Sequence, residues 1–159
     1  FRTFKKRDIS QWKPITVLRE PVALALSHYS FVRRHPAHPW YPQVIGLTFS
    51  QYVERDLQAP NMQCHVIAGE KSAGSAYDVL RREFFLASTI ENVAHLTAAL
   101  SGHLGVAITM PRLNVAPEPT NTDAIDPRTR ARLLALNSED AELHRRVLGD
   151  VLVGRGAPN

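Results

Sequence analysis

Cysteine is almost absent from this sequence, since Cys64 is the only one among 159 residues. A single cysteine excludes an internal disulfide framework and a zinc site built from several cysteines. The chain also has no apolar run that approaches the length of a membrane span, and no secretory signal opens it. We therefore expect a cytoplasmic protein, because a reducing compartment suits a chain without disulfides.

Aromatic residues are also few, at 8%, and they do not cluster among the basic residues. This pattern argues against a nucleic-acid binder that stacks bases beside its cations. The net charge of +4 fits an anionic cofactor or an acidic glycan, although charge alone also fits weak nucleic-acid contact. The hydrophobic fraction of 44% and the length predict one globular domain over residues 1–159.

The most informative stretch runs from Ile15 to Arg34. Residues 15–18 form a continuous apolar and β-favouring run, which predicts a strand buried on both faces. Pro21 suits the first position of a helix, and apolar or small residues follow it at helical spacing as far as Val32. The expected unit is a strand, a tight turn and a helix.

Two side chains of this unit suit an anion. Arg19 is expected at the carboxyl end of the strand, beside free N–H groups of the first helical turn, which attract anions. Ser27 lies about two turns along the helix and offers a hydroxyl to a ligand lying along it. Together these groups suit a phosphate or a sulfate. The spacing alone fits at least as well an Arg19–Glu20 surface pair and a solvated Ser27.

At this stretch the sequence resembles the sulfotransferases that use 3′-phosphoadenosine 5′-phosphosulfate. Their 3′-phosphate-binding motif, R-[DE]-P followed by S-x-Y, is matched by Leu18-Arg19-Glu20-Pro21, Ser27-His28-Tyr29 and Phe31-Val32-Arg33-Arg34. The similarity is greatest to the glycan branch that includes heparan sulfate 2-O-sulfotransferase and its bacterial relatives. The resemblance implies that Arg19 and Ser27 bind the 3′-phosphate of the cofactor. Leu24 stands where the family often has a second arginine.

The resemblance also implies an α/β fold, the P-loop-like sulfotransferase fold, with a short parallel sheet flanked by helices. In that family a first strand–loop–helix unit holds the 5′-phosphosulfate, and no counterpart is found before the basic start at residues 5–7. The catalytic base of the glycan branch, a histidine or glutamate, lies between that loop and the arginine motif. We therefore expect the chain to correspond to the carboxyl-terminal two-thirds of such an enzyme, and we assign no catalytic residue. His28 is a poor replacement base, because adjacent helical residues point about 100° apart.

Three residues are predicted to lie on the acceptor side. The proline-rich segment 35–42 is expected to be extended, with Trp40 either stacking on a sugar or packing in the core. Residues 61–69 resemble the N-x-Q-T-x-x-L-x-G segment near the acceptor cleft of the family, which implies that Asn61 and Gln63 contact the acceptor. The alternative is that these two side chains satisfy buried backbone groups.

Arg112 lies in the stretch 111–126, which is rich in Pro, Asn, Thr and Asp and is expected to be a loop or lid. Residues 112–117 resemble the R-N-V-T-P segment of the family, which suggests Arg112 as a further charge at the cofactor site; an ordered surface loop is the alternative. His35 and His38 are three residues apart but have no third ligand near in sequence, so no metal site is predicted.

The remaining pattern predicts mainly structural elements. Residues 69–76 look superficially like a phosphate loop but lack the order G-x-x-x-x-G-K-[ST]. We expect a helix with a Thr48–Gln51 capping box and a buried strand over 84–87. A second helix should be capped by Ser88 or Thr89 and should end near Gly102 or Gly105. A final helix should be capped by Asp126, and its apolar residues are Leu133, Leu136, Leu143 and Val147.

Taken together, these features and the resemblance predict a sulfotransferase, or a fragment of one, that transfers a sulfuryl group to a hydroxyl, which we expect to be that of a carbohydrate. The transfer would be an in-line displacement assisted by electrostatic stabilisation and a general base. The alternative is a non-catalytic nucleotide- or polyanion-binding module that retains only the 3′-phosphate site. The expected partners are the anionic nucleotide donor and a glycan acceptor, without a metal or a specific nucleic acid. An exposed sheet edge would also favour a homodimer.

Overall fold

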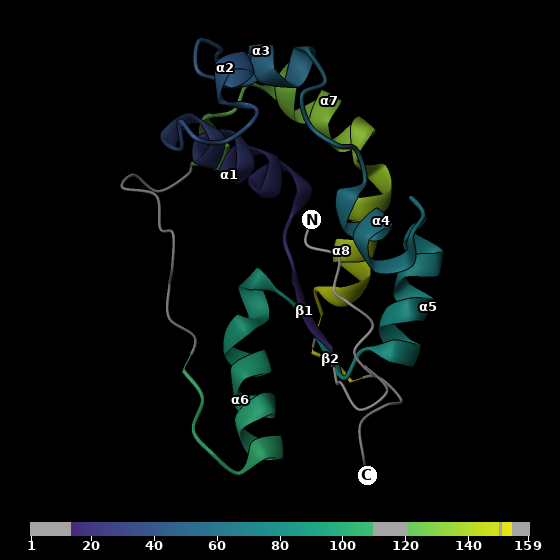
Figure 1. Cartoon of the computed structure of the whole chain (residues 1–159). Helices are drawn as coiled ribbons and strands as arrows, with labels where there is room; N and C mark the ends of the chain where they lie inside the picture. Colours follow the sequence, from purple (N-terminus) through teal and green to yellow (C-terminus); the bar gives the residue numbers. More distant parts are fainter. Residues whose placement is uncertain (1–13, 110–120, 150, 154–159) are drawn as a thin grey trace.

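The computed structural model describes residues 14–109, 121–149 and 151–153. These residues form an α/β structure in which helices surround a small sheet (Figure 1). The strands β1 (Ile15–Leu18), β2 (Leu86–Thr89) and β3 (Leu152–Val153) lie in the order β1-β2-β3. Strands β1 and β2 are parallel, as expected, whereas β3 pairs with β2 in the antiparallel direction and was not predicted.

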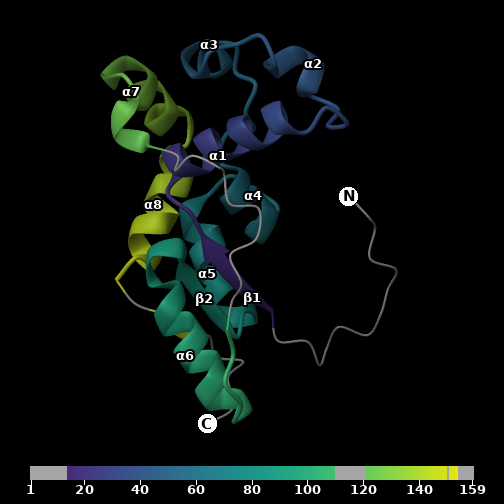
Figure 2. The same ribbon diagram turned by 90° about the vertical axis from the view of Figure 1, so that its left-hand side faces the viewer.

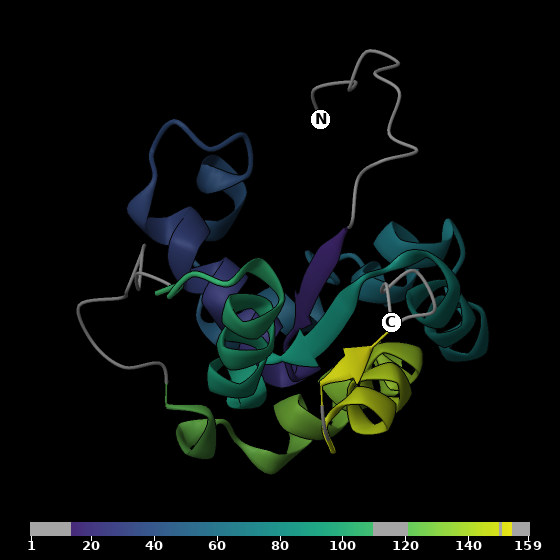
Figure 3. The same ribbon diagram turned by 90° about the horizontal axis from the view of Figure 1, so that it is seen from below.

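The helices lie on both faces of the sheet and beyond its carboxyl edge. They are α1 (Pro21–Arg34), α2 (Tyr41–Val44), α3 (Phe49–Glu54), α4 (Met62–Ala68), α5 (Ala73–Glu83), α6 (Val93–Leu104), α7 (Pro127–Leu136) and α8 (Ser138–Val147), with 3-10 turns at Ile90–Asn92 and Thr122–Ala124. Helix α6 lies on one side of the sheet, and α5 and α8 lie on the other (Figure 3). Among the described residues no helix is both long and apolar enough to cross a membrane.

Three buried clusters hold these layers together. One joins β1 and β2 to α4, α5 and α8, and a small one joins β2 to α6. The third packs α1 against α2, α3 and α7 at the carboxyl end of the strands. Figure 2 shows α1 between the sheet and the α2–α3 segment. The buried residues of this third cluster are Val22, Ala25, Tyr29, Val32, Val44, Tyr52, Val53 and Leu133.

The predicted strand–turn–helix unit is confirmed at β1 and α1. Glu20 is the N-cap residue, Pro21 is the first helical residue, and Arg33 and Arg34 lie in the last turn. The prediction that β1 is buried on both faces is wrong, because Ile15 and Val17 are 41% and 38% exposed. Strand β1 is at the edge of the sheet, and α6 packs against β2 instead.

Two element boundaries also differ from expectation. Ser88 and Thr89 are buried residues of β2, and neither caps α6, which begins only after the 3-10 turn with Asn92 as its N-cap residue. Thr89 is the N-cap residue of the 3-10 turn but makes no side-chain cap bond. The predicted final helix is two helices, α7 and α8, separated at Asn137. Asp126 does cap α7, and the Thr48–Gln51 capping box is confirmed at α3.

The segment 35–42 is not extended. It forms turns closed by hydrogen bonds from His38 N to His35 O and from Tyr41 N to His38 O, and it then enters α2. Pro42 occupies one of the first two positions of that helix, where a proline loses no hydrogen bond. The turns bring Trp40 back beside α1, where its ring meets that of His28.

Candidate functional site

Arg19 and Ser27 meet at the carboxyl edge of the sheet. Arg19 directly follows β1, and Ser27 lies in the second turn of α1. The Arg19 Nη1 donates a hydrogen bond to Ser27 Oγ at 3.0 Å. The structure therefore brings together the two residues that, according to the resemblance, bind the 3′-phosphate. The pairing of Arg19 with Glu20 alone, which was the alternative, is not observed among the described ion pairs.

The main chain of Arg19 is fixed by Gln63 in α4. Arg19 N donates to Gln63 Oε1 at 2.9 Å, and Gln63 Nε2 donates to Arg19 O at 2.9 Å. Such a reciprocal pair mimics strand pairing across 44 positions of sequence. Gln63, which the resemblance placed on the acceptor side, uses its amide here to position Arg19.

The Arg19–Ser27 pair has donors to spare. Arg19 Nε is buried and has no hydrogen-bond partner among the described residues. The Ser27 hydroxyl accepts a hydrogen bond from Arg19 Nη1, and within the described residues it donates to no acceptor. A buried, unpaired guanidinium nitrogen is costly. An anion with several oxygens, such as a phosphate or sulfate, would accept from both groups at once.

The helix N-terminus contributes less than expected. The Glu20 carboxylate accepts from Ala23 N at 2.7 Å and so occupies one of the N–H groups that we expected to be free for an anion. Pro21 offers no N–H, and Leu24 N donates to the Glu20 carbonyl. An anion at this place would therefore depend on the side chains of Arg19 and Ser27.

Helices α4 and α8 cap each other, and this accounts for Asn61. Asn61 Oδ1 accepts from Glu139 N and Asp140 N, both at 3.1 Å. In return, the Asp140 carboxylate accepts from Gln63 N at 3.0 Å and Cys64 N at 2.8 Å. The carboxamide oxygen of Asn61 is thus used to satisfy backbone groups, which was the alternative to its predicted acceptor contact.

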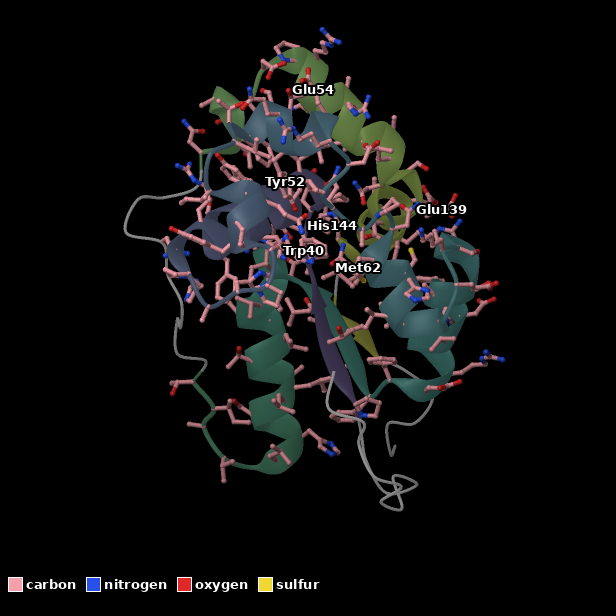
Figure 4. All side chains as sticks on the ribbon, turned by 45° about the horizontal axis from the view of Figure 1, so that its top comes forward. Trp40, Tyr52, Glu54, Met62, Glu139 and His144 are labelled. Atoms are coloured by element: carbon pink, nitrogen blue, oxygen red, sulfur yellow. The ribbon has the colours of Figure 1, made fainter. Side chains whose placement is uncertain are left out.

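Trp40 lies at a different cavity. This cavity has a volume of about 180 Å³, and Arg19, Ser27, Asn61 and Gln63 are not among its lining residues. The Trp40 ring is edge-on to the ring of His28, with 5.5 Å between centroids. Figure 4 shows Trp40, Tyr52 and Met62, which line this cavity from three different segments. Of the predicted site residues, the structure thus separates Trp40 from the Arg19–Ser27 pair.

Two further predictions concern the loops. Arg112 lies outside the described residues, so its predicted contribution is untested. The stretch that resembles a phosphate loop is the start of α5: Ser72 caps the helix, and the Glu139 carboxylate accepts from Ala73 N at 2.8 Å. A carboxylate already occupies the place where a phosphate would bind.

Burial shifts the pKa values of Cys64 and His28. Burial, and then the hydrogen bond to Asp140, raises the pKa of the Cys64 thiol, so Cys64 is not a nucleophile. Burial, followed by the charge of His38, lowers the pKa of His28.

In residues 14–109, 121–149 and 151–153 no three His, Cys, Asp or Glu side chains converge in a way that could hold a metal ion.

Sequence reasoning missed one polar contact at the carboxyl edge. The His144 Nε2 lies 3.3 Å from Glu91 Oε2, which joins α8 to the turn after β2. Burial tends to raise the pKa of Glu91, but hydrogen bonds from the backbone, Thr89 and His144 outweigh it and lower that pKa. The residues are 53 positions apart, so no local signal could have revealed the pair.

The comparisons with known proteins give no family assignment. No protein-family model, curated protein or solved structure matched this chain.

Proposed function

We propose that the chain binds the 3′-phosphate of 3′-phosphoadenosine 5′-phosphosulfate and belongs to a sulfotransferase that acts on a hydroxyl of a carbohydrate. The observation that carries the proposal is the 3.0 Å contact between Arg19 Nη1 and Ser27 Oγ, beside a buried Arg19 Nε without a partner among the described residues. The resemblance of the motif selects the nucleotide, because the geometry alone suits any phosphate.

The strand–turn–helix geometry supports the proposed P-loop-like fold. In parallel α/β sheets, ligands bind beyond the carboxyl ends of the strands, and Arg19 follows the carboxyl end of β1. In the proposed reaction Arg19 and Ser27 bind and orient the donor. The general base and the contacts to the transferred group are assigned to no described residue. A cytoplasmic location is part of the proposal, since the one cysteine forms no disulfide within the chain.

The test is calorimetric titration with 3′-phosphoadenosine 5′-phosphate and with adenosine 5′-phosphate, which lacks the 3′-phosphate. We expect the chain to prefer the first nucleotide. Arg19→Ala should weaken its binding by about 1.5–3 kcal/mol, the scale of a hydrogen bond to a charged group, and should abolish the preference. Ser27→Ala should have a smaller effect in the same direction.

Arg34→Ala is the matched control, because it removes the same charge at the other end of α1. Among the described residues the Arg34 side chain bonds only to the Ser30 carbonyl. It should leave both affinities nearly unchanged. Equal binding of the two nucleotides, or equal losses in Arg19→Ala and Arg34→Ala, would contradict the proposal. Specific binding of the 3′-phosphate without any sulfuryl transfer would favour the alternative, a non-catalytic nucleotide-binding module.

A further inference from the structure

The cavity beside Trp40 has a composition unlike that of the Arg19–Ser27 site. We call it the Trp40 pocket. Its lining comes from α1, the turn that carries Trp40, α3, α4, the loop before α4, and the start of α8. Most of its lining is apolar, including Leu24, Ala25, Trp40 and Met62. Of the residues that line it, Asp140 is the only one with a formal charge. An acidic group with no cation beside it excludes a phosphate or sulfate as the occupant.

The volume of the Trp40 pocket sets the size of a ligand. A dry apolar cavity of about 150 Å³ holds one benzene molecule. The Trp40 pocket, at about 180 Å³, has room for one six-membered ring and a short substituent. Trp40, which lines the pocket, is 38% exposed.

Two polar groups of the Trp40 pocket lack partners among the described residues. Gln58 Nε2 is buried and has no hydrogen bond there. His28 uses Nδ1 for the hydroxyl of Tyr52, at 3.0 Å, which leaves its Nε2 without a hydrogen bond in the described part of the chain. An unpaired buried amide N–H is unfavourable, so a ligand that accepts from Gln58 would gain affinity.

The protonation of these groups narrows the ligand chemistry. Burial raises the pKa of Tyr52 to about 12, so Tyr52 keeps its proton. The His28 imidazole is neutral, and either of its tautomers fits the bond to Tyr52, so its Nε2 donates or accepts according to the tautomer. A hydroxyl is suited to both cases, because it donates and accepts.

We propose that the Trp40 pocket binds a neutral, mainly apolar ring that carries one hydroxyl, as in an aromatic or alicyclic alcohol. The ring fills the space between Trp40, Leu24 and Met62, and the hydroxyl meets Gln58. This inference does not rest on the proposed 3′-phosphate site, because the two sites share no lining residue.

The test uses three probes: benzyl alcohol, toluene as the same ring without the hydroxyl, and glucose as a polar ring. In a Trp12→Phe background Trp40 is the one remaining tryptophan of the chain, so its fluorescence reports binding. We expect dissociation constants in the millimolar range for such small ligands, with benzyl alcohol bound about five- to tenfold more tightly than toluene and glucose not bound.

The key variant is Gln58→Met, which keeps the length of the side chain but removes the amide. It should abolish the preference for benzyl alcohol and leave toluene binding within about twofold. Leu24→Arg should prevent binding of both rings, because it places a cation in an apolar wall. If circular dichroism shows that the Leu24→Arg chain does not fold, the comparison of benzyl alcohol and toluene binding by Gln58→Met still tests the proposal.

Three results would overturn the proposal: equal binding of toluene and benzyl alcohol by the parent chain, stronger binding of glucose, or no response of Trp40 to any probe in a folded chain. Arg19→Ala separates this proposal from the proposed function. It should leave benzyl alcohol binding unchanged while the binding of 3′-phosphoadenosine 5′-phosphate is weakened. Loss of both would contradict the independence of the two sites.

Discussion

The first turns of α1 border two sites of opposite chemistry. Ser27 faces Arg19, with a guanidinium nitrogen that is buried and lacks a partner in the described part of the chain. Leu24, Ala25 and His28 instead line the Trp40 pocket, which has no cation among its lining residues. Ser27 and His28 are neighbours in sequence, but adjacent helical residues point about 100° apart. A single helix can therefore serve an anion on one face and an apolar ring on the next.

The contrast between the two sites also accounts for the leucine at position 24. The resemblance aligns it with a position where sulfotransferases often have a second arginine, and here that position lines the Trp40 pocket. An arginine there would have to leave its charge in or beside an apolar wall, which is unfavourable without a partner. The proposed anion site therefore relies on Arg19 and Ser27, and the side chain at position 24 lines the Trp40 pocket.

Both sites nevertheless depend on α4. Gln63 fixes the main chain of Arg19, and its neighbour Met62 lines the Trp40 pocket. The start of α4 is in turn held by Asp140, which accepts from Gln63 N and Cys64 N. The two sites differ in chemistry but share this support.

Asp140→Ala should have the largest effect, because it removes the support of both sites. The carboxylate is 1% exposed, and its loss leaves two backbone N–H groups of α4 without acceptors. We expect the free energy of unfolding to fall by about 3 kcal/mol. Urea denaturation would measure this loss, and titrations should show weaker binding of both 3′-phosphoadenosine 5′-phosphate and benzyl alcohol.

Two other variants test the cause. Asp140→Asn keeps one acceptor oxygen and should lose about half as much stability. Ser138→Ala changes an exposed residue of the same helix and should alter the free energy of unfolding by less than about 0.5 kcal/mol. A stable Asp140→Ala chain that binds both ligands normally would show that the cap does not support the sites.

Gln63→Leu should separate the two sites. The substitution removes both hydrogen bonds to the Arg19 main chain and replaces the amide with an apolar group of similar size. We expect a stability loss of about 1–2 kcal/mol and a five- to twentyfold weaker affinity for 3′-phosphoadenosine 5′-phosphate, because Arg19 is no longer held in place. Benzyl alcohol binding should not change, since Gln63 does not line the Trp40 pocket.

Arg19→Ala made in the Gln63→Leu chain provides the check on this role. If Gln63 acts through Arg19, the double variant should bind the nucleotide no more weakly than Arg19→Ala alone. Additive losses would instead indicate that Gln63 affects nucleotide binding by a route other than Arg19.

Local signals were sufficient to predict the Arg19–Ser27 unit. The apolar run 15–18, Pro21 and the helical spacing to Val32 are all properties of neighbouring residues, and they give β1 and α1 correctly. The Thr48–Gln51 box and the Asp126 cap succeeded for the same reason. In both caps the bonded partners are three residues apart, so the sequence shows the whole interaction.

The remaining features depend on distant partners. The break between α7 and α8 falls at Asn137, whose Oδ1 accepts from Asn61 N, 76 positions away. The side chains of Asn61 and Gln63 bond to backbone groups of α8 and of Arg19, which was the alternative to their predicted acceptor contacts, but the sequence could not identify these distant partners. The Trp40 pocket combines segments from α1 to α8, and only the packed structure brings them together.

The smallest expected effect is the pH dependence of the Trp40 pocket. Burial, and then the nearby His38, lowers the pKa of His28 below 6.5, so folding favours the neutral imidazole. Its stabilising contribution is complete above pH 6.5 and is lost as the pH falls through the lowered pKa. The other groups around it are the hydroxyl of Tyr52, whose pKa of about 12 keeps it neutral, and the Asp140 carboxylate in the same lining.

Benzyl alcohol affinity in the Trp12→Phe chain should therefore be constant from pH 8 to pH 6.5 and should fall about two- to threefold towards pH 5. The cause is that a protonated His28 must stay hydrated and can no longer accept from the hydroxyl of the ligand. His28→Gln should remove this dependence, whereas His38→Gln should only shift it to higher pH, because a neighbouring positive charge is lost. An equal fall in the His28→Gln chain would assign the effect to another group and would leave the Trp40 pocket defined by its apolar walls and Gln58.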